Sequence, residues 1–142
     1  MEFSLDASLG FILNLSNTRM KNNLLHHFKE YNVTPEQWAI LNRLWEKEGL
    51  SSKELAELTS KDQPTTVRIL SRLERKSFIT RQVNPEDSRA YIISLTSEGR
   101  AIKDKLVPLA NEALNKAIHG ISKEELEVTK AVLNKLTKNL ER

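Results

Sequence analysis

Three arginines, Arg68, Arg72 and Arg75, recur at spacings of four and three residues. On an α-helix with about 100° per residue, their side chains fall within about 60° of one another, and Thr65 adjoins them. Like charges in so narrow a stripe repel each other unless an anion lies against them. The guanidinium fork of arginine matches the O6 and N7 atoms of guanine, and it also matches a phosphate. The stripe therefore favours a nucleic-acid partner over the alternative, an ordinary solvated helix face.

The charge of the surrounding segment agrees with this interpretation. The chain of 142 residues has 22 Lys and Arg, 19 Asp and Glu, and a formal net charge of +3. Residues 61–89 contain seven basic and four acidic residues, which makes +3 in this segment alone. The other 113 residues balance at fifteen of each sign. A basic segment in an otherwise balanced chain indicates a local surface for an anionic partner.

We expect two kinds of DNA contact from this region. Base contacts should come from the end of the helix that enters the major groove deepest, with Arg68 as the principal base-reading residue. Phosphate contacts should come from cations further along and from hydroxyls at the start of the preceding helix. For Ser51, helix capping is an equally good explanation. The expected base-contact residues are Gln63, Pro64, Thr65 and Arg68, and the expected phosphate-contact residues are Ser51, Ser52, Lys61, Arg72, Arg75 and Lys76.

A further cation follows in the tripeptide Asp87-Ser88-Arg89, within a polar turn. A lone arginine in a turn is usually just solvated. Beside an acid, at the tip of a hairpin that flanks a basic helix, it can instead point into the adjacent minor groove, where negative potential is concentrated. We expect Arg89 to enter that groove, and we expect Asp87 to orient it without touching DNA.

Caps and hydrophobic periodicity define the helices that must position these residues. Three pairs have the capping-box spacing of a helix start: Thr34 with Gln37, Ser51 with Glu54, and Ser122 with Glu125. The expected helices are 5–31, 35–47, 52–58, 62–76, 96–119 with a bend at Pro108, and 122–140. The expected inner faces are Leu55, Ala56 and Leu58 in 52–58, and Val67, Leu70 and Leu73 in 62–76.

Between residues 79 and 95 the period of the sequence changes to that of strands. Ile79, Arg81 and Val83 alternate with polar neighbours, residues 90–95 alternate likewise, and residues 84–88 have the composition of a turn. Short helices followed by such a β-hairpin predict a winged helix-turn-helix. The expected fold class is mainly α with a small β-hairpin wing, and with further helices at both ends of the chain.

The same region resembles a known family. The motifs are Arg72-Leu73-Glu74-Arg75-Lys76, then Ile79, Arg81, Asp87-Ser88-Arg89 and Leu95-Thr96-Ser97-Glu98-Gly99. In this combination and spacing they resemble the MarR (multiple antibiotic resistance regulator) family of bacterial winged helix-turn-helix transcription factors, and helix order and length match over essentially the whole chain. Two residues depart from the family pattern. Ser77 stands where the family usually has a glycine before the first wing strand, and Pro64 lies in the first turn of the recognition helix.

The resemblance implies a homodimer whose N- and C-terminal helices interleave and whose two winged domains bind a palindromic duplex. It implies an N-terminal dimerisation helix in 1–33, a winged helix-turn-helix in 34–96 and C-terminal dimerisation helices in 97–142, all in one compact unit. The sequence agrees independently, because the apolar stripes at both ends offer more surface than one small winged domain can cover. An intrachain helical hairpin is the alternative. The C-terminal stripe is Leu126, Leu133, Leu136 and Leu140.

The function that the resemblance implies is sequence-specific regulation of transcription, of the repressor type, with DNA affinity lowered by a small-molecule effector. Similar members often hold an aromatic effector between the dimerisation helices and the winged domain. Aromatic residues at helical spacing are otherwise ordinary core residues. The candidates to line a pocket for a small aromatic or lipophilic molecule are Phe11, His26, His27, Trp38 and Trp45.

Other chemistry is not indicated. The chain has no cysteine, which excludes disulfides, thiolate metal sites, cysteine nucleophiles and a thiol-based redox sensor. His26 and His27 point about 100° apart on one helix and His119 stands alone, so we expect no metal site. Without a phosphate loop, nucleophile elbow or recognisable carboxylate pair, we expect neither cofactor nor enzyme activity. The alternatives to DNA binding are a winged-helix module that binds protein and a structural helical dimer.

The N-terminus carries acidic residues where a signal peptide has basic ones. The apolar stretch around Gly10 to Leu13 is far too short to span a bilayer. We expect a cytoplasmic protein without a membrane anchor.

Overall fold

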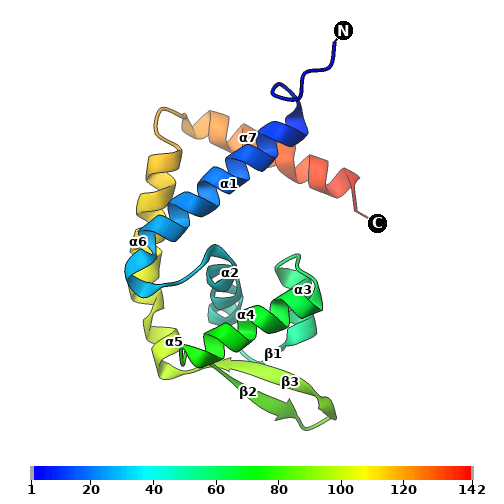
Figure 1. Ribbon diagram of the computed structural model, residues 1–142, viewed down its shortest axis with the longest axis vertical. Helices are drawn as coiled ribbons and strands as arrows, with labels where there is room; N and C mark the ends of the chain where they lie inside the picture. Colours follow the sequence, from blue (N-terminus) through cyan, green and yellow to red (C-terminus); the bar gives the residue numbers. More distant parts are fainter. Residues whose placement is uncertain (1, 142) are drawn as a thin grey trace.

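A computed structural model describes residues 2–141, with the backbone alone described at Ser88 and Arg89. The chain is mainly helical with one small sheet, as the sequence predicts. In Figure 1, α2, α3, α4 and the sheet form a lower lobe, and α1, α6 and α7 extend above it. The elements are α1 Leu9–His27, the 3-10 helix η1 Lys29–Tyr31, α2 Pro35–Glu46, β1 Leu50–Ser51, α3 Ser52–Leu58, α4 Gln63–Arg75, β2 Ile79–Asn84, β3 Asp87–Leu95, α5 Ser97–Ala101, α6 Lys103–Ala117 and α7 Lys123–Asn139.

The expected helix starts are confirmed. Thr34, Ser51 and Ser122 each accept a hydrogen bond from the amide three residues on, and the side chain at that position bonds back to the cap amide. Each reciprocal pair satisfies two backbone donors that a helix start would otherwise leave unbonded. These caps explain why local residues are enough to locate α2, α3 and α7.

The sheet has three strands in the order β1-β3-β2, all antiparallel. The expected hairpin of β2 and β3 is present, with Ile79 opposite Leu95 and Val83 opposite Tyr91. The sequence analysis missed β1, which has only two residues and pairs Leu50 with Ile93. Because β1 precedes α3 directly, this pairing ties the start of the helix-turn-helix to the base of the wing.

The hydrophobic core lies between α2, α3, α4 and the sheet, and it extends to α6 through Leu106. Two expectations about burial are wrong. Leu58 at the end of α3 is 43% exposed, and Val67 in α4 is 41% exposed. In α4 the buried side chains are Thr66, Ile69, Leu70 and Leu73. The buried stripe of α4 is therefore rotated away from Val67.

The helix expected over 96–119 is divided into α5 and α6 at Ile102. The predicted position of the irregularity, Pro108, instead lies inside α6. A proline in a helix interior lacks an N–H and crowds the carbonyl four residues before it. One turn earlier the backbone tightens, because the amide of Lys105 donates to the carbonyl of Ile102 at 3.0 Å. This junction redirects the chain from the winged lobe into α6 (Figure 1).

The terminal helices leave apolar side chains in solvent. No residue of α1 or α7 is buried within the described chain. The expected N-terminal helix is also shorter than 5–31, because it ends at His27 and η1 follows. The strongly exposed apolar residues of α1 and α7 are Leu9, Ile12, Leu15, Met20, Leu25, Val128 and Val132.

Candidate nucleic-acid interface

The basic helix α4 begins on a well-formed cap. Asp62 accepts a hydrogen bond from the amide of Thr65 at 2.7 Å. Hydrogen bonds from Thr65, first from its amide, hold the pKa of the Asp62 carboxyl below its usual value. Pro64 occupies the first turn of α4. Backbone N–H groups in the first turn have no acceptor within the helix, so the missing N–H of proline costs no helical hydrogen bond. The departure from the family pattern at Pro64 is thus compatible with a regular recognition helix.

Three arginines lie on the exposed side of α4, opposite its buried stripe. Arg68, Arg72 and Arg75 are all exposed. The Arg68 guanidinium donates to the hydroxyl of Thr65 at 3.3 Å. Among the described residues, none of the three arginines forms an ion pair with an acid. Three unneutralised cations on one helix side are a surface that an anion stabilises.

Lys76 at the end of α4 has a different environment from the arginines. Its ammonium donates to the backbone carbonyl of Asn32, and to the side-chain oxygen of Gln37 at 2.8 Å. Burial lowers the pKa of Lys76, and the neighbouring Arg72 lowers it further. Two of its three N–H groups are therefore used inside the protein. Lys76 joins the recognition helix to the start of α2.

A pocket of about 320 Å³ lies beside this lysine. The pocket lies between the end of α4 and the start of α2, and three cationic side chains line it. Its lining residues are Asn32, Thr34, Gln37, Arg72, Arg75 and Lys76. The expected phosphate-contact residues Arg72, Arg75 and Lys76 are thus brought together at one end of α4.

The hydroxyl of Ser51 takes part in a capping box, as one of the two sequence explanations requires. Ser51 accepts from the amide of Glu54 at 3.1 Å, and Glu54 accepts from the amide of Ser51 at 3.2 Å. The Ser51 hydroxyl can still donate its own proton. Ser52 begins α3, and Lys61 lies in the turn between α3 and α4.

An ion pair that the sequence analysis did not predict links α4 to the wing. The Arg81 guanidinium binds both carboxylate oxygens of Glu74, at 2.8 and 3.3 Å. It also lies 5.7 Å from the centroid of the Tyr91 ring. The hydrogen bond from Arg81 lowers the pKa of Glu74, and the same hydrogen bond raises the pKa of Arg81. Opposite charges at positions 74 and 81, on either side of the helix-to-strand turn, were the signal that could have revealed this contact.

The tip of the wing is a tight turn between Asn84 and Asp87, and the Asn84 side chain accepts from the amide of Glu86 at 2.9 Å. Asp87 is exposed and begins β3. The side chains of Ser88 and Arg89 lie outside the described residues, so the expected roles of Asp87 and Arg89 in the minor groove stay predictions.

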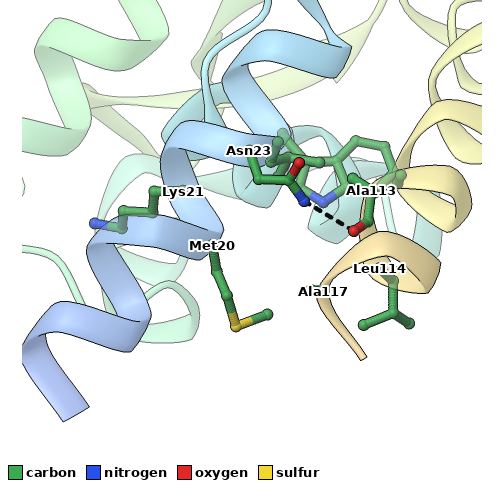
Figure 2. Close-up of a pocket in the computed structure, with 9 residues that line it drawn as sticks. Met20, Lys21, Asn23, Ala113, Leu114 and Ala117 are labelled. Atoms are coloured by element: carbon green, nitrogen blue, oxygen red, sulfur yellow. Dashed lines mark hydrogen bonds between the residues drawn. The ribbon is translucent and has the colours of Figure 1, made fainter. Parts of the chain in front are cut away.

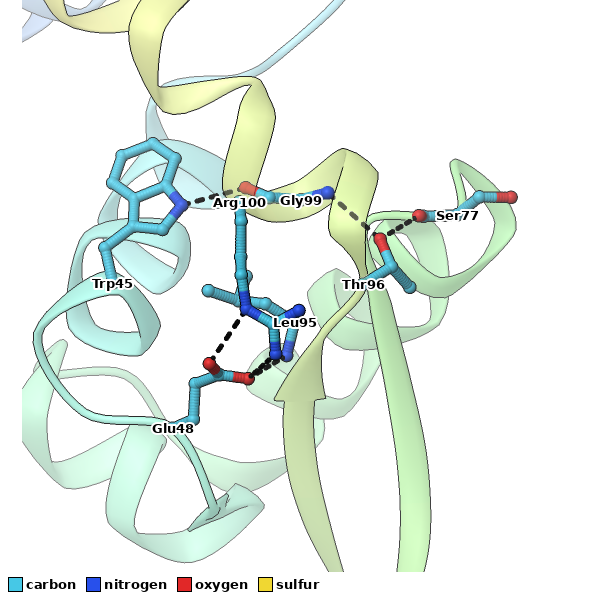
Figure 3. A network of polar contacts seen from close by, with 7 residues as sticks. All are labelled: Trp45, Glu48, Ser77, Leu95, Thr96, Gly99 and Arg100. Carbon is cyan, nitrogen blue, oxygen red and sulfur yellow. Dashed lines mark hydrogen bonds and ion pairs between the residues drawn. The ribbon is translucent and has the colours of Figure 1, made fainter.

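The wing ends in a polar network shown in Figure 3. Ser77 lies in the left-handed region with φ 65°, so a serine makes the turn for which the family usually has a glycine. The Thr96 hydroxyl donates to the Ser77 carbonyl at 2.5 Å and accepts from the Gly99 amide at 3.0 Å. A Cβ atom at Gly99 would lie 2.0 Å from the Phe78 carbonyl oxygen. The Leu-Thr-x-x-Gly motif therefore holds α5 directly against the turn that follows α4.

The same network connects α2 to α5. The Arg100 guanidinium binds Glu48 at 2.9 and 3.1 Å, and Glu48 also accepts from the amide of Leu95 at 2.9 Å. The indole N–H of Trp45 donates to the Gly99 carbonyl at 2.9 Å. These contacts fix the winged lobe to the helices that lead away from it (Figure 3).

The five residues expected to line an effector pocket are not brought together within the chain. Phe11 lies near the start of α1 and His26 near its end, about 22 Å apart along the axis. The two histidines contact each other, and Trp38 contacts Trp45, as two separate ring pairs. The Trp45 indole is already bonded to Gly99. The expected role of these five residues in binding an effector stays a prediction.

Figure 2 shows an apolar pocket of about 220 Å³ between α1 and α6. Of the five expected residues, only Trp38 lines it. Two polar neighbours are already satisfied, because Asn23 donates to the Ala113 carbonyl at 2.8 Å and Lys21 lies 3.5 Å from Glu36. The lining residues are Met20, Lys21, Asn23, Leu24, Trp38, Ala110, Ala113, Leu114 and Ala117.

The described residues, 2–141, show neither a metal-binding cluster nor a membrane-spanning helix. Within that range, no group of three His, Cys, Asp or Glu side chains could hold a metal ion. No helix in the same range is long and apolar enough to cross a bilayer.

Comparisons with known proteins agree with the fold. The family model described as MarR family matches residues 33–91. The organic hydroperoxide resistance transcriptional regulator of Bacillus subtilis (strain 168) is 33% identical over 139 residues, which cover 96% of this chain and 91% of that protein.

Two solved structures extend the comparison. A probable transcriptional regulator from Pseudomonas aeruginosa is 32% identical with a TM-score of 0.86, covering 94% of this chain and 99% of that one. The complex of S. aureus MepR with DNA is 27% identical with a TM-score of 0.86, covering 98% of this chain and 100% of that one.

The capped basic helix, the hairpin beside it and the core beneath them define a winged helix-turn-helix protein that binds DNA. The identity to the Bacillus regulator extends over nearly the whole of both chains. This chain belongs to the MarR family, and it is a DNA-binding transcriptional regulator.

Proposed function

We propose that this protein is a dimeric, cytoplasmic repressor that binds a palindromic duplex, and whose affinity for DNA a small apolar molecule lowers. In this proposal each α4 enters a major groove and each wing tip enters the adjacent minor groove. The chain has no catalytic role. The observation that carries the proposal is the set of three exposed arginines on α4, none of which forms a close ion pair among the described residues.

The two ends of α4 would make different contacts with DNA: base contacts at the N-terminal end and phosphate contacts at the C-terminal end. Gln63, Pro64, Thr65 and Arg68 lie at the N-terminal end and would contact bases. Arg72, Arg75 and Lys76 line the pocket at the other end, whose positive charge suits the DNA backbone. Because Lys76 already has two protein acceptors, its contribution to DNA binding is smaller than that of either arginine.

The exposed apolar sides of α1 and α7 support a homodimer. Leu9 in α1 is 59% exposed. In α7 the expected stripe residues Leu126, Leu133 and Leu136 are half-buried, and Val128, about 160° around the helix from Leu126, is 62% exposed. Burial of apolar surface contributes about 25 cal/mol per Å², so pairing of two chains is the arrangement that removes this surface from water. A two-fold dimer presents two copies of α4 to two half-sites about one helical turn apart.

The apolar pocket between α1 and α6 supports control by an effector. At about 220 Å³ it would hold a molecule of roughly one aromatic ring. The Bacillus relative is named for organic hydroperoxide resistance. A signal by thiol oxidation is excluded within this chain, because it contains no cysteine. The effector would therefore bind without a covalent step at a thiol.

DNA binding is tested with duplexes selected from random sequence, at several salt concentrations. Specific affinities of about 10⁻⁸ to 10⁻¹¹ M that fall steeply with salt are expected. Arg68→Ala should cost about 1–3 kcal/mol for each half-site and should remove the preference at one base position. Equal weakening on every sequence would instead make Arg68 a phosphate contact. Absence of salt-dependent duplex binding would favour a module that binds protein.

Effector binding is tested through the Trp38 indole, which lines the pocket. Phenol and indole are suitable one-ring and two-ring probes, with Trp fluorescence and DNA affinity as the two readouts. Ala110→Leu should fill part of the pocket, abolish the response to phenol and leave DNA affinity unchanged. An unchanged phenol response in Ala110→Leu would place the effector elsewhere.

A further inference from the structure

Val67 is an apolar side chain on the exposed side of α4, where it is 41% exposed. Its neighbours one helical turn away along the same side are Gln63 and Ser71, and the next residue is Arg68. Val67 lies at the edge of the buried stripe of α4, about 60° around the helix from Leu70 and about 100° from Arg68.

Thr66, the residue before Val67, is polar but lies in the core. Thr66 is fully buried, and its hydroxyl donates to the carbonyl of Asp62 at 2.8 Å. Threonine and valine have the same branched shape, so a helix with valine inside and threonine outside would bury more apolar surface. A β-branched residue also lowers helix propensity at an exposed position. Stability of the fold therefore does not account for valine at position 67.

The major groove of DNA offers one apolar group at its base edges, the C5-methyl of thymine. We propose that Val67 contacts the C5-methyl group of a thymine, beside the base pair contacted by Arg68. This inference rests on the proposed function, because it requires α4 in the major groove. It names part of the half-site: a T·A pair within about two base pairs of the guanine that Arg68 contacts.

The surroundings of Val67 favour this partner over an apolar protein surface. Gln63, Arg68 and Ser71 are polar or charged. Pro64, one turn before Val67, is the other exposed apolar residue of α4, so the apolar area on this helix is small. An apolar protein surface laid over this side would leave the Arg68 cation without water or an acceptor. A base edge offers acceptors and an isolated methyl group within a few ångströms of each other, which matches an arginine beside a valine.

The test replaces each thymine of the tightest-binding selected duplex, one at a time, with deoxyuridine. This change removes only the C5-methyl group. Burial of one methyl group corresponds to about a fourfold change in affinity. The wild-type protein should lose about fourfold at one thymine in each half-site, and about fifteenfold when both are replaced. The sensitive thymine should lie next to, or one base pair beyond, the guanine whose recognition depends on Arg68.

A double-mutant cycle then assigns the methyl contact to Val67. Val67→Ala should weaken binding to the thymine duplex severalfold, and deoxyuridine at the sensitive position should cost this variant no further affinity. The matched control is Val83→Ala, which truncates another exposed valine, on the wing at 54% exposure. Val83→Ala should retain the full deoxyuridine effect. Arg68→Ala should retain it as well, and circular dichroism should show that all three variants are folded.

Two results would overturn the inference while leaving the proposed function intact. One is specific duplex binding by the wild type that no deoxyuridine weakens. The other is a deoxyuridine effect of the same size in Val67→Ala as in the wild type. Failure of the wild type to select any duplex sequence would overturn the proposed function and the thymine contact together.

Discussion

Ser77 holds a backbone conformation with φ 65° that costs a residue with a Cβ atom about 1–2 kcal/mol. Its carbonyl accepts from Thr96, and this bond does not depend on the side chain at position 77. Ser77→Gly should therefore raise the free energy of unfolding by about 0.5–1 kcal/mol, after the greater freedom of glycine in the unfolded chain is included. Denaturant unfolding measures the change, and Ser77→Ala should give no such gain. Destabilisation by Ser77→Gly would mean that the serine side chain itself supports this turn.

The roles of Arg89 and Asp87 are tested by whether replacing each residue weakens or tightens DNA binding. If Arg89 enters a narrow minor groove, Arg89→Ala should flatten the salt dependence of binding by about one unit and cost most on A·T-rich flanks. Asp87→Ala should also weaken binding, although it removes a negative charge near DNA. Tighter binding by Asp87→Ala at fixed salt, with the dimer shown to be folded, would mean that Asp87 does not position Arg89.

At the scale of elements, the ion pair of Glu74 with Arg81 sets how the wing lies against α4. The folded-state pKa of Glu74 is lowered, so the stabilisation is fully present above the usual glutamate pKa and is lost as pH falls through the lower folded value. The raised pKa of Arg81 acts only at strongly alkaline pH. Because the side chain of Glu74 is 40% exposed, solvent screening limits the pair to about 0.5 kcal/mol.

Glu74→Gln should therefore destabilise the protein slightly at pH 7, and the difference from wild type should vanish toward pH 3. Free energies of unfolding at several pH values measure this convergence. Glu57→Gln is the matched control, since Glu57 is an exposed acid of α3 without an ion pair among the described residues. A difference that stays constant down to pH 3 would show that the glutamate acts through packing.

Much of this element order could be predicted because the signals are local. The capping boxes at Thr34, Ser51 and Ser122 each join two residues only three positions apart. The alternation of side chains that indicates β2 is contained in the five residues from Ile79 to Val83. The two-residue strand β1 could not be predicted, since its only support is pairing with β3, more than forty residues later along the chain. Position 67 was misassigned because a valine fits the buried pattern, while the fold instead buries the neighbouring threonine.

The site shows the same division between local and distant causes. The exposed arginines of α4 follow from helical spacing alone, and their positions on one side of the helix agree with the sequence analysis. The partner of Lys76 is 39 residues away in another helix, so no local pattern predicts it. The opposite charges at positions 74 and 81 could have indicated the ion pair of Arg81, because only the helix-to-strand turn separates them. Residue type alone does not determine which helix side faces a cavity, so the five-residue effector pocket stays a prediction.

At the scale of the whole molecule, pairing of chains is the central expectation. We predict a dimer by sedimentation velocity at micromolar concentration. Replacing Val128 and Val132 together by glutamate should give a folded monomer, because neither side chain is buried within the chain, and the monomer should bind the full palindrome at least a hundredfold more weakly. Asn134→Glu adds a charge about 160° away from Val132 on the same helix and should leave the dimer intact. A monomeric wild type would refute the pairing.

The exposed apolar sides of α1 and α7 also make the fraction of paired chains depend on the concentration of this protein in the cell. If two chains must meet before those surfaces leave water, each tenfold dilution lowers the stability of the pair by about 1.4 kcal/mol. Promoter occupancy then falls more steeply than the number of chains, because dilution removes DNA-binding units and also splits those that remain. A modest change in synthesis or degradation would thus change promoter occupancy more than in proportion.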